Sequence, residues 1–328
     1  MQAIGYSAFG AARDVLQVHD LATPDPGPGE VLVELHMSGV NPSDVKARAG
    51  ARPGVTKPAF PMIVPHSDGA GTVVAVGAGV DAARIGTRVW IWNGQWQRAF
   101  GTCASHIALP AQQAVEMPDH VTFETGAQMG IPGLTAAHAV FAAGEVRGKR
   151  VLVNGAAGTV GHLAAQLAVW GGAEVFATAR GAGLDRARQA GAHHVFDYTA
   201  PDLSAQILAA AGGSIDHVVE VEFGVNADMI AEVIAENGSV CAYGSAKNMR
   251  PEIPFYTMMF KAVTLHMALI YILPLDLRQA AIARLHAALG EGALNVPVSE
   301  VFSLDDAHLA HEAVEAGGRD GGILVRCG

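Results

Sequence analysis

The residues best suited to chemistry form a turn of small side chains. The turn lies in VLVNGAAGTVGHLAAQLAVWG, residues 151–171, between an apolar strand and an apolar helix. Its members form a variant of the GxGxxG pattern: Gly155, Ala156, Ala157, Gly158, Thr159, Val160 and Gly161. Small residues are needed where a pyrophosphate meets backbone N–H groups at the positive end of a helix. We therefore expect a dinucleotide here, with Gly158 leaving room for the phosphate and Gly161 allowing the helix to pack on the strand.

The second strand indicates which dinucleotide binds. A lone glycine pattern also occurs in ordinary turns, but strands and helices that alternate around this one favour a dinucleotide. NAD sites place a carboxylate about 20 residues after the glycines, whereas FATARGAG has Arg180 there and no carboxylate before Asp185. Arg180 can pair with a 2′-phosphate, so the sequence favours NADP(H) as cofactor. The alternative is that Arg180 is a solvated turn residue in a protein that also uses NADH.

The fourteen histidines and three cysteines do not combine into a recognisable metal or nucleophile site. Catalytic zinc needs three converging Cys, His or carboxylate ligands. His66 has Asp68 close by in PHSDGAG, but the first hundred residues lack cysteine, and the adjacent His193 and His194 face opposite ways in a strand. Cys103 has no recognisable orienting partner and is expected to be a small buried residue. We therefore expect a reaction that needs no metal.

The four tryptophans include three in one aromatic segment, VWIWNGQWQRAF. Trp90 and Trp92 alternate as in a strand with one buried face. Trp96 and Phe100 fall on an expected loop, where large apolar groups often line a pocket for a flat ligand. We expect these two residues to line the substrate pocket.

The elements that must position these residues divide the 328-residue chain into three segments. Residues 1–122 are rich in glycine and proline with short β-like runs, which indicates a β-rich domain. Residues 123–262 alternate strands with single helices, which predicts right-handed βαβ units and a parallel sheet. Residues 263–328 return to the first domain. The fold class is thus α/β, with a doubly wound dinucleotide-binding domain inserted in a β-rich domain.

The expected elements of the inserted and last segments follow from periodicity. Strands are expected at 151–154, 174–178, 193–198, 215–221, 239–244, 268–272, 296–302 and 323–327. Helices are expected from Val160 onward and at 184–191, 202–212, 226–238, 276–292 and 305–316.

Composition narrows the choice of partners and compartment. The net charge of −10 without a basic stripe argues against nucleic acid or an anionic membrane as the partner. Three cysteines cannot build a disulfide framework, and the start of the chain lacks the pattern of a signal peptide. The longest apolar stretch, residues 263–275, is too short to span a bilayer. These observations predict a soluble, cytoplasmic protein.

Several motifs together resemble one family, the zinc-independent quinone oxidoreductases of the medium-chain dehydrogenase/reductase superfamily, which include ζ-crystallin. The motifs are SGVNPSDVKARAG, PHSDGAGTVVAVGAG, GIPGLTAAHAV, GAAGTVG, GAHHVFDY and the late YGS, in the family's order over essentially the whole chain. The resemblance implies a GroES-like domain with an inserted Rossmann domain. It also implies a homodimer joined through edge strands of the Rossmann sheets.

The resemblance assigns roles to residues of the β-rich domain. Asn41 is similar to the residue beside the nicotinamide and the substrate, where zinc-dependent relatives have a cysteine ligand. Ser67 and Ile131 take the positions of their other two ligands, so a metal site is absent position by position. His66 is one place off this register. Asp44, four residues before Arg48, can pair with it on a helix and shape the substrate pocket.

The resemblance also assigns cofactor contacts in the inserted domain. Thr135 is similar to a threonine that contacts the nicotinamide side. Gly244 and Ser245 resemble a strand-end pair beside the cofactor. Tyr198 resembles a tyrosine that approaches the 2′-phosphate, in agreement with the interpretation of Arg180. The tryptophan-bearing loop is longer than in ζ-crystallin, and Arg180 also departs from the family's pattern.

The chemistry expected from these features is hydride transfer from the nicotinamide C4 to a quinone. A quinone oxygen delocalises the negative charge, so the protein needs a dry slot and one hydrogen-bond donor, for which Asn41 is the candidate. Asn41 as a plain turn residue before Pro42 is the alternative. A second activity is reduction of the C=C bond of an α,β-unsaturated ketone, aldehyde or thioester. A third is a non-catalytic, crystallin-like cofactor-binding protein.

Overall fold

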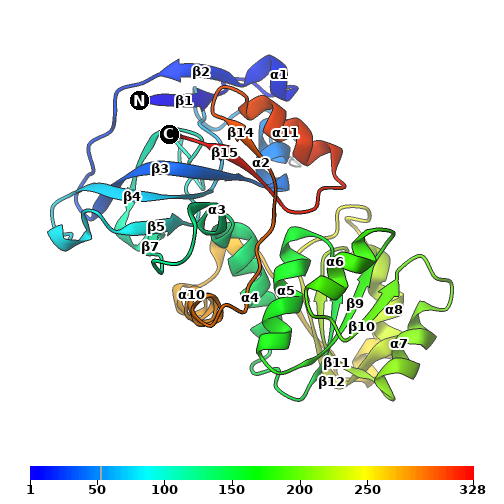
Figure 1. Cartoon of the computed structure of the whole chain (residues 1–328). Coiled ribbons are helices and arrows are strands. Elements are labelled where there is room, and N and C mark those ends of the chain that lie inside the picture. The colour runs from blue at the N-terminus through cyan, green and yellow to red at the C-terminus, as the bar shows by residue number, and fades with distance from the viewer. Residues whose placement is uncertain (52–53) are drawn as a thin grey trace. The chain divides into compact units, whose positions relative to one another are not determined.

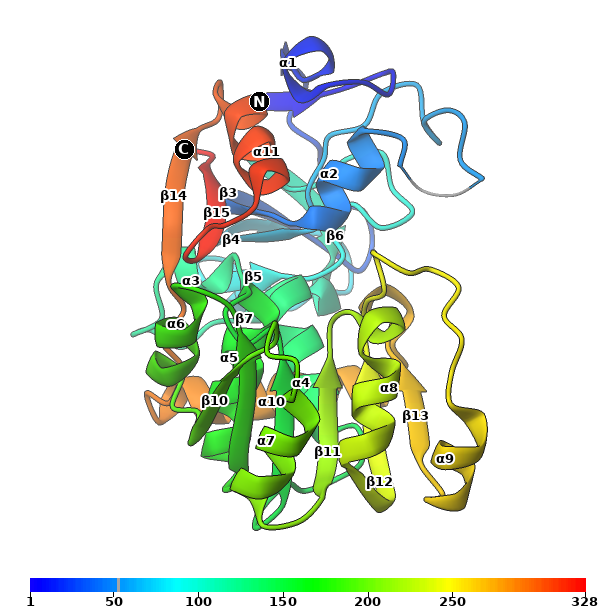
Figure 2. The same ribbon diagram turned by 90° about the vertical axis from the view of Figure 1, so that its right-hand side faces the viewer.

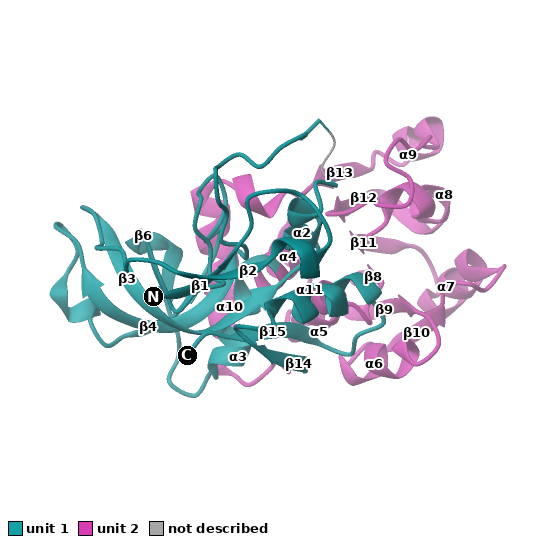
Figure 3. Cartoon of the chain, turned by 90° about the horizontal axis from the view of Figure 1, so that it is seen from above, with its two compact units in different colours: residues 1–131, 296–328 teal, residues 132–295 magenta. Residues whose placement is uncertain are grey.

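The computed structural model describes residues 1–51 and 54–328 and divides them into two compact units. The first unit combines residues 1–131 with residues 296–328, and the second comprises residues 132–295 (Figure 3). The second unit is therefore inserted in the first, as the sequence predicts.

The second unit is built on a six-stranded sheet in which every neighbouring pair is parallel. The chain order reverses between two central strands, and sheets of this kind bind ligands beyond the carboxyl ends of the strands at such a point. Figure 2 shows the sheet with its last three strands side by side. In order across the sheet the strands are β10 (His194–Asp197), β9 (Glu174–Ala179), β8 (Arg150–Asn154), β11 (Ile215–Glu220), β12 (Ile234–Ala242) and β13 (Thr264–Met267).

Helices flank this sheet (Figure 1). They are α4 (Leu134–Phe141), α5 (Thr159–Trp170), α6 (Gly183–Gln189), α7 (Leu203–Ala211), α8 (Phe223–Val233), α9 (Phe255–Phe260) and α10 (Leu275–Gly290). Side chains alternate along a strand, and β8 uses both of its faces. Leu152 joins a core cluster with residues of α7 and α8, while its buried neighbours Val151 and Val153 point to the opposite face. The expected α/β Rossmann architecture is confirmed.

The first unit is dominated by β-structure, with its long strand β3 at the centre. β3 pairs antiparallel with β4, β6 and β15. The strands are β1 (Gln2–Gly5), β2 (Gln17–Asp20), β3 (Glu30–Val40), β4 (Asp68–Val76), β5 (Arg88–Ile91), β6 (His106–Pro110), β7 (Ala114–Glu116), β14 (Val298–Ser303) and β15 (Gly322–Arg326). The helices are α1 (Ala12–Val15), α2 (Pro42–Arg48), α3 (Phe123–Gly126) and α11 (Ala307–Ala316).

The bounds of the two units differ from those expected at residues 122 and 262. Helix α3 packs on β4 and β5, so residues 123–131 belong to the first unit. Strand β13 pairs with β12, and α10 packs on α4, so residues 263–295 belong to the second. The return to the first unit therefore begins at Val296.

Two of the expected elements are wrong. The helix expected at 226–238 ends at Val233, because Ile234 begins strand β12 and pairs with Ile215. The strand expected at 268–272 is a 3₁₀ turn at Ile270–Ile272, and Arg278 donates a hydrogen bond of 2.5 Å to the Ile270 carbonyl. At Ile234 the pairing with another strand overrides the helical pattern, and at Ile270 a side chain eight positions away bonds to the backbone.

Buried aromatic and sulfur side chains of the first unit follow the sequence. Trp90 and Trp92 are both buried, and the strand β5 carries Trp90. Cys103 is free and fully buried, as expected. Within the part of the chain that the structure describes, no helix is both long enough and apolar enough to cross a membrane.

Candidate functional site

The glycine turn follows β8 at the point where the sheet order reverses. Gly155 has a φ of +70°, which favours glycine, and a Cβ there would lie 2.9 Å from Val221. A Cβ on Gly161 would lie 2.3 Å from the Gly155 carbonyl oxygen, so α5 needs glycine to pack on the turn. Gly158 is different, because a Cβ there would meet only the Gly155 oxygen, at 3.5 Å. Packing within the protein therefore does not explain why residue 158 is glycine.

The N-terminus of α5 offers hydrogen-bond donors to an anion. Gly158 is the exposed N-cap, and no side chain caps the helix. The first turn of this twelve-residue helix contains no acidic residue. Its free N–H groups and the helix dipole favour negative charge. These features suit an anion, and contacts of residues 155–161 with a phosphate group stay a prediction.

A buried hydrogen-bond network holds the glycine turn at Gly155. The sequence analysis did not predict this network. Thr178 accepts a hydrogen bond from the Gly155 N–H at 3.3 Å and donates one to Asn154 Oδ1 at 2.9 Å. Asn154 Nδ2 donates in turn to Glu220 at 2.5 Å, and Asn226 Nδ2 donates to the same carboxylate at 2.9 Å. Burial raises the pKa of Glu220 although these donors oppose the rise. The only signal in the sequence is a polar residue at the end of an apolar strand.

Arg180 and Tyr198 lie together beside the ends of β9 and β10. The Arg180 guanidinium carbon is 5.8 Å from the centroid of the Tyr198 ring, and both side chains are exposed. Hydrogen bonds from Thr199 lower the pKa of Asp197, and the charge of Arg180 adds to this effect. The structure therefore brings the two residues expected at a 2′-phosphate close to each other, with one carboxylate nearby.

The other expected cofactor residues of the second unit occupy tight positions. A Cβ on Gly244 would lie 2.3 Å from the Val221 carbonyl oxygen. Ser245 Oγ accepts a hydrogen bond from Gly224 N–H at 2.9 Å and donates one to the Asn248 carbonyl at 2.5 Å. Thr135 is buried on α4. Their contacts with a cofactor stay predictions.

In the first unit, Asn41 is the N-cap of α2 and is held from two sides. Its backbone N–H donates to Asp44 Oδ2 at 2.8 Å, as in a capping box. Its side-chain Nδ2 donates to Asp68 Oδ2 at 2.8 Å. All three residues are buried. Arg48 binds Glu315 and the Gly10 carbonyl, so its expected pairing with Asp44 stays a prediction.

Asp68 is fully buried, and sequence analysis considered it only as a neighbour of His66. Burial raises the pKa of Asp68, and the charge of Asp44 raises it further. Hydrogen bonds from the Asn41 side chain and the Ile131 backbone oppose this rise. Asp68 lies 27 positions from Asn41 in the chain, so only the pairing of β3 with β4 brings the two together.

His66 is fully buried in the first unit. Its φ is 75°, unusual for a residue other than glycine. Hydrogen bonds of 2.9 Å join its Nδ1 to Ser38 Oγ and its Nε2 to His311 Nε2. Burial lowers the pKa of His66 to about 3. Both nitrogens of His66 are therefore engaged by neighbouring side chains.

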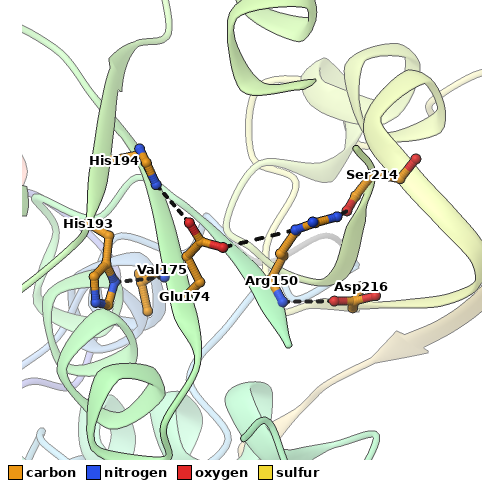
Figure 4. Close-up of polar contacts among 7 residues, drawn as sticks. All are labelled: Arg150, Glu174, Val175, His193, His194, Ser214 and Asp216. Carbon is orange, nitrogen blue, oxygen red and sulfur yellow. Dashed lines mark hydrogen bonds and ion pairs between the residues drawn. The ribbon is translucent and has the colours of Figure 1, made fainter. Parts of the chain in front are cut away.

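The remaining candidates for metal ligands do not converge. Figure 4 shows that His193 and His194 make separate contacts, as expected: His193 Nδ1 accepts from Val175 N–H at 3.0 Å, and His194 Nε2 bonds to Glu174 at 2.9 Å. Among residues 1–51 and 54–328, no group of three or more His, Cys, Asp or Glu side chains is placed to hold a metal ion. The three positions that the resemblance matches to zinc ligands carry an amide, a hydroxyl and an apolar chain, and a reaction without metal stays a prediction.

Trp96 and Phe100 line two different cavities, and their role in binding a substrate stays a prediction. The cavity at Trp96 measures about 230 Å³ and is also lined by Tyr6, Phe9 and Phe60. The cavity at Phe100 measures about 440 Å³ and includes Arg98. Asp44 lines neither of them and instead holds Asn41. The loop turns sharply between the two aromatic residues, with a positive φ of 58° at Gln97.

Comparison with known proteins places the whole chain among oxidoreductases. The profile described as "Alcohol dehydrogenase GroES-like domain" matches residues 27–119, and the profile described as "Zinc-binding dehydrogenase" matches residues 159–287. The quinone oxidoreductase of Sus scrofa is 32% identical over 96% of this chain and 94% of its own.

Solved structures agree over the full length. The Escherichia coli quinone oxidoreductase complexed with NADPH superposes with a TM-score of 0.84 at 25% identity, and covers 99% of this chain and 100% of its own. A mycobacterial protein complexed with NADPH gives a TM-score of 0.85 at 28% identity, with the same coverage.

Proposed function

Since the chain belongs to the quinone oxidoreductase family of the medium-chain dehydrogenase/reductase superfamily, we propose that it is an NADPH-dependent reductase that transfers a hydride to a quinone without a metal ion. The observation that carries this proposal is Gly158, a glycine that packing does not require, at the uncapped N-terminus of α5. The NADPH complexes of the similar proteins support the same cofactor.

The residues of the second unit fit this cofactor. When bound, the nicotinamide supplies a hydride from its C4 atom. The turn at 155–161 would hold the pyrophosphate with backbone N–H groups, and the network of Thr178, Asn154 and Glu220 keeps the turn in shape. Thr135, Gly244 and Ser245 would flank the nicotinamide end.

Arg180 and Tyr198 would hold the 2′-phosphate and so select NADPH over NADH. A guanidinium pairs strongly with phosphate oxygens, and the Tyr198 ring limits the directions that Arg180 samples. Asp197 opposes a phosphate by charge, but its carboxylate is engaged by Thr199. The alternative, that Arg180 is only a solvated residue, predicts equal affinity for the two dinucleotides.

Asn41 would donate a hydrogen bond to the oxygen of the acceptor as negative charge develops there. Its surroundings suit this role, because the side chain is 7% exposed and held by Asp68. The proton can come from water. The unsuitable donors at residues 41, 67 and 131 support a reaction without zinc.

The cavity at Trp96 would take the apolar part of the acceptor. Its aromatic walls suit a flat, unsaturated molecule, and Ala47 in the last turn of α2 connects it to the helix that Asn41 caps. Such walls also accept an α,β-unsaturated ketone, aldehyde or thioester, which keeps that reduction as the second candidate.

We also propose a cytoplasmic homodimer that forms through β13. This strand ends the sheet, and apolar side chains on and around it are exposed, including Met267 at 75% and Phe260 at 79%. An exposed apolar edge strand invites pairing with a second copy. The three free, buried cysteines suit a reducing compartment. Analytical ultracentrifugation of the wild type and of Met267→Lys tests the dimer, since the charge should yield monomers.

Steady-state oxidation of NADPH with two panels of acceptors tests the function. Turnover of 1,4-benzoquinone and 1,4-naphthoquinone supports the proposal. Turnover of enones alone favours the second candidate. Tight binding of NADPH without turnover of any acceptor favours a non-catalytic, crystallin-like protein.

A further inference from the structure

The side chain of Asn41 has partners on both of its amide atoms. In the capping box the Asp44 carboxylate accepts from the Asn41 backbone and the Asp44 backbone N–H faces the Asn41 side chain, whereas Asp68 accepts a hydrogen bond from the side-chain amide nitrogen. An amide group presents either its oxygen or its nitrogen to a partner, and the partner decides which. An acceptor at Oδ2 of Asp68 selects the nitrogen.

We propose that Asp68 is a positioning residue that turns the Asn41 amide so that the second Nδ2 hydrogen can bind the oxygen of the hydride acceptor. The inference rests on the proposed function, because Asn41 is the donor there. Oδ2 of Asp68 accepts from Asn41 when the carboxyl group is ionised. It also accepts when the group is neutral and the proton lies on Oδ1. The orientation therefore holds in both protonation states.

The position of Asp68 is itself closely confined. A Cβ on Gly130 would lie 2.2 Å from Asp68 Oδ1, and a Cβ on Gly39 would lie 3.2 Å from Asp68 Cβ. Both positions therefore need glycine to leave room for the Asp68 side chain. Thr102 Oγ1 donates to the Asp68 backbone carbonyl at 2.6 Å and fixes the main chain. The carboxyl group that accepts from Asn41 is therefore closely packed, and its backbone is hydrogen-bonded.

A purely structural role explains this residue poorly. Full burial of an acid is unfavourable, and the nearby Asp44 makes it more so. Packing alone would favour an apolar residue at this position. Acids kept in such surroundings cluster at functional sites.

A double-mutant cycle on the full-length protein tests the inference. Asn41→Ala, Asp68→Ala and the double variant are compared by kcat and KM for 1,4-naphthoquinone with NADPH. We expect Asp68→Ala to lower kcat by about 10- to 100-fold, the usual effect of removing a group that orients a functional side chain. The Kd for NADPH should not change. In the Asn41→Ala background, Asp68→Ala should have no further effect on kcat, since both changes remove one function.

Two further variants separate positioning from stability. Asp68→Asn keeps an acceptor oxygen toward Asn41 and should retain kcat within about threefold, with an unchanged pH profile. Thr102→Val removes the bond to the Asp68 backbone but leaves the carboxylate, so it should lower kcat less than Asp68→Ala does. Asp68→Asn also keeps the test decisive if Asp68→Ala does not fold, which circular dichroism reports.

The outcomes distinguish the two proposals. No quinone turnover by the wild type would overturn the proposed function and this inference with it. Normal kcat in Asn41→Ala would overturn the role of Asn41 and this inference, and would leave NADPH-dependent quinone reduction in place. A lowered kcat in Asn41→Ala, with a further loss of kcat in the double variant equal to that of Asp68→Ala, would overturn this inference and leave the proposed function in place. An Asp68→Asn variant as slow as Asp68→Ala would overturn it as well, because an acceptor oxygen would then be insufficient.

Discussion

Replacement of Arg180 by alanine isolates the contribution of the 2′-phosphate to cofactor binding. The Arg180 side chain is exposed, and its guanidinium carbon lies 5.8 Å from the centroid of the Tyr198 ring. Its charge also acts on the Asp197 carboxylate. A hydrogen bond between charged groups contributes about 1.5–3 kcal/mol, and 1.4 kcal/mol corresponds to about tenfold in Kd. Because the site is solvated, we expect the lower half of this range. The Kd for NADPH should rise by about 10- to 50-fold.

Fluorescence titration of the purified variant with NADPH and with NADH measures this effect. NADH lacks the 2′-phosphate, so its Kd should stay within about twofold. Arg188→Ala is the matched control, since Arg188 is a nearby exposed arginine that pairs with Asp185. Higher salt should reduce the difference between NADPH and NADH in the wild type. Equal losses for the two dinucleotides in Arg180→Ala would refute the assignment of Arg180 to the phosphate.

Three further predictions follow from the same structure. Gly158→Val should abolish measurable NADPH binding with little loss of stability. Gly161→Ala should lower the free energy of unfolding by about 1–3 kcal/mol, because its Cβ would meet the Gly155 oxygen. Urea unfolding and NADPH titration of both variants test this, and a smaller loss of stability in Gly161→Ala than in Gly158→Val would contradict it. Elemental analysis should find no stoichiometric zinc, and one equivalent of zinc with activity lost on chelation would disprove the metal-free reaction. His66 is buried in its neutral form with a pKa of about 3 against 6.5 when unfolded, so the unfolded chain binds the proton first, and the free energy of unfolding should fall from about pH 6.5 toward pH 3, by up to about 1.4 kcal/mol per pH unit. His66→Gly, which also suits the positive φ, should lose less stability over this pH range. An identical dependence of stability on pH in the variant would show that His66 does not cause the loss.

Much of the fold could be predicted because its signals are local. Each strand of the Rossmann sheet is a short apolar run followed by a turn, and the glycine turn is contiguous in sequence. The errors arose where distant pairing decides the outcome. Ile234 continues a helical pattern but pairs with Ile215 in a strand, and Ile270 resembles a strand residue but binds Arg278.

The site was predicted less completely for the same reason. Asn41, Arg180 and Tyr198 could be proposed from motifs, whereas the partners that hold them come from other strands. Glu220 lies 66 positions from Asn154, and the pairing of β11 with β8 brings the ends of these strands together. Trp96 and Phe100 are four positions apart, yet a sharp turn between them directs the two side chains into separate cavities.

Isothermal titration of the wild-type protein with NADPH, alongside Gly158→Val, tests most directly whether the glycine turn holds the diphosphate of the cofactor. The account predicts one site per chain with micromolar or tighter affinity in the wild type and no heat of binding in the variant. Wild-type protein that binds neither NADPH nor NADH, or a variant that binds NADPH as the wild type does, would contradict it.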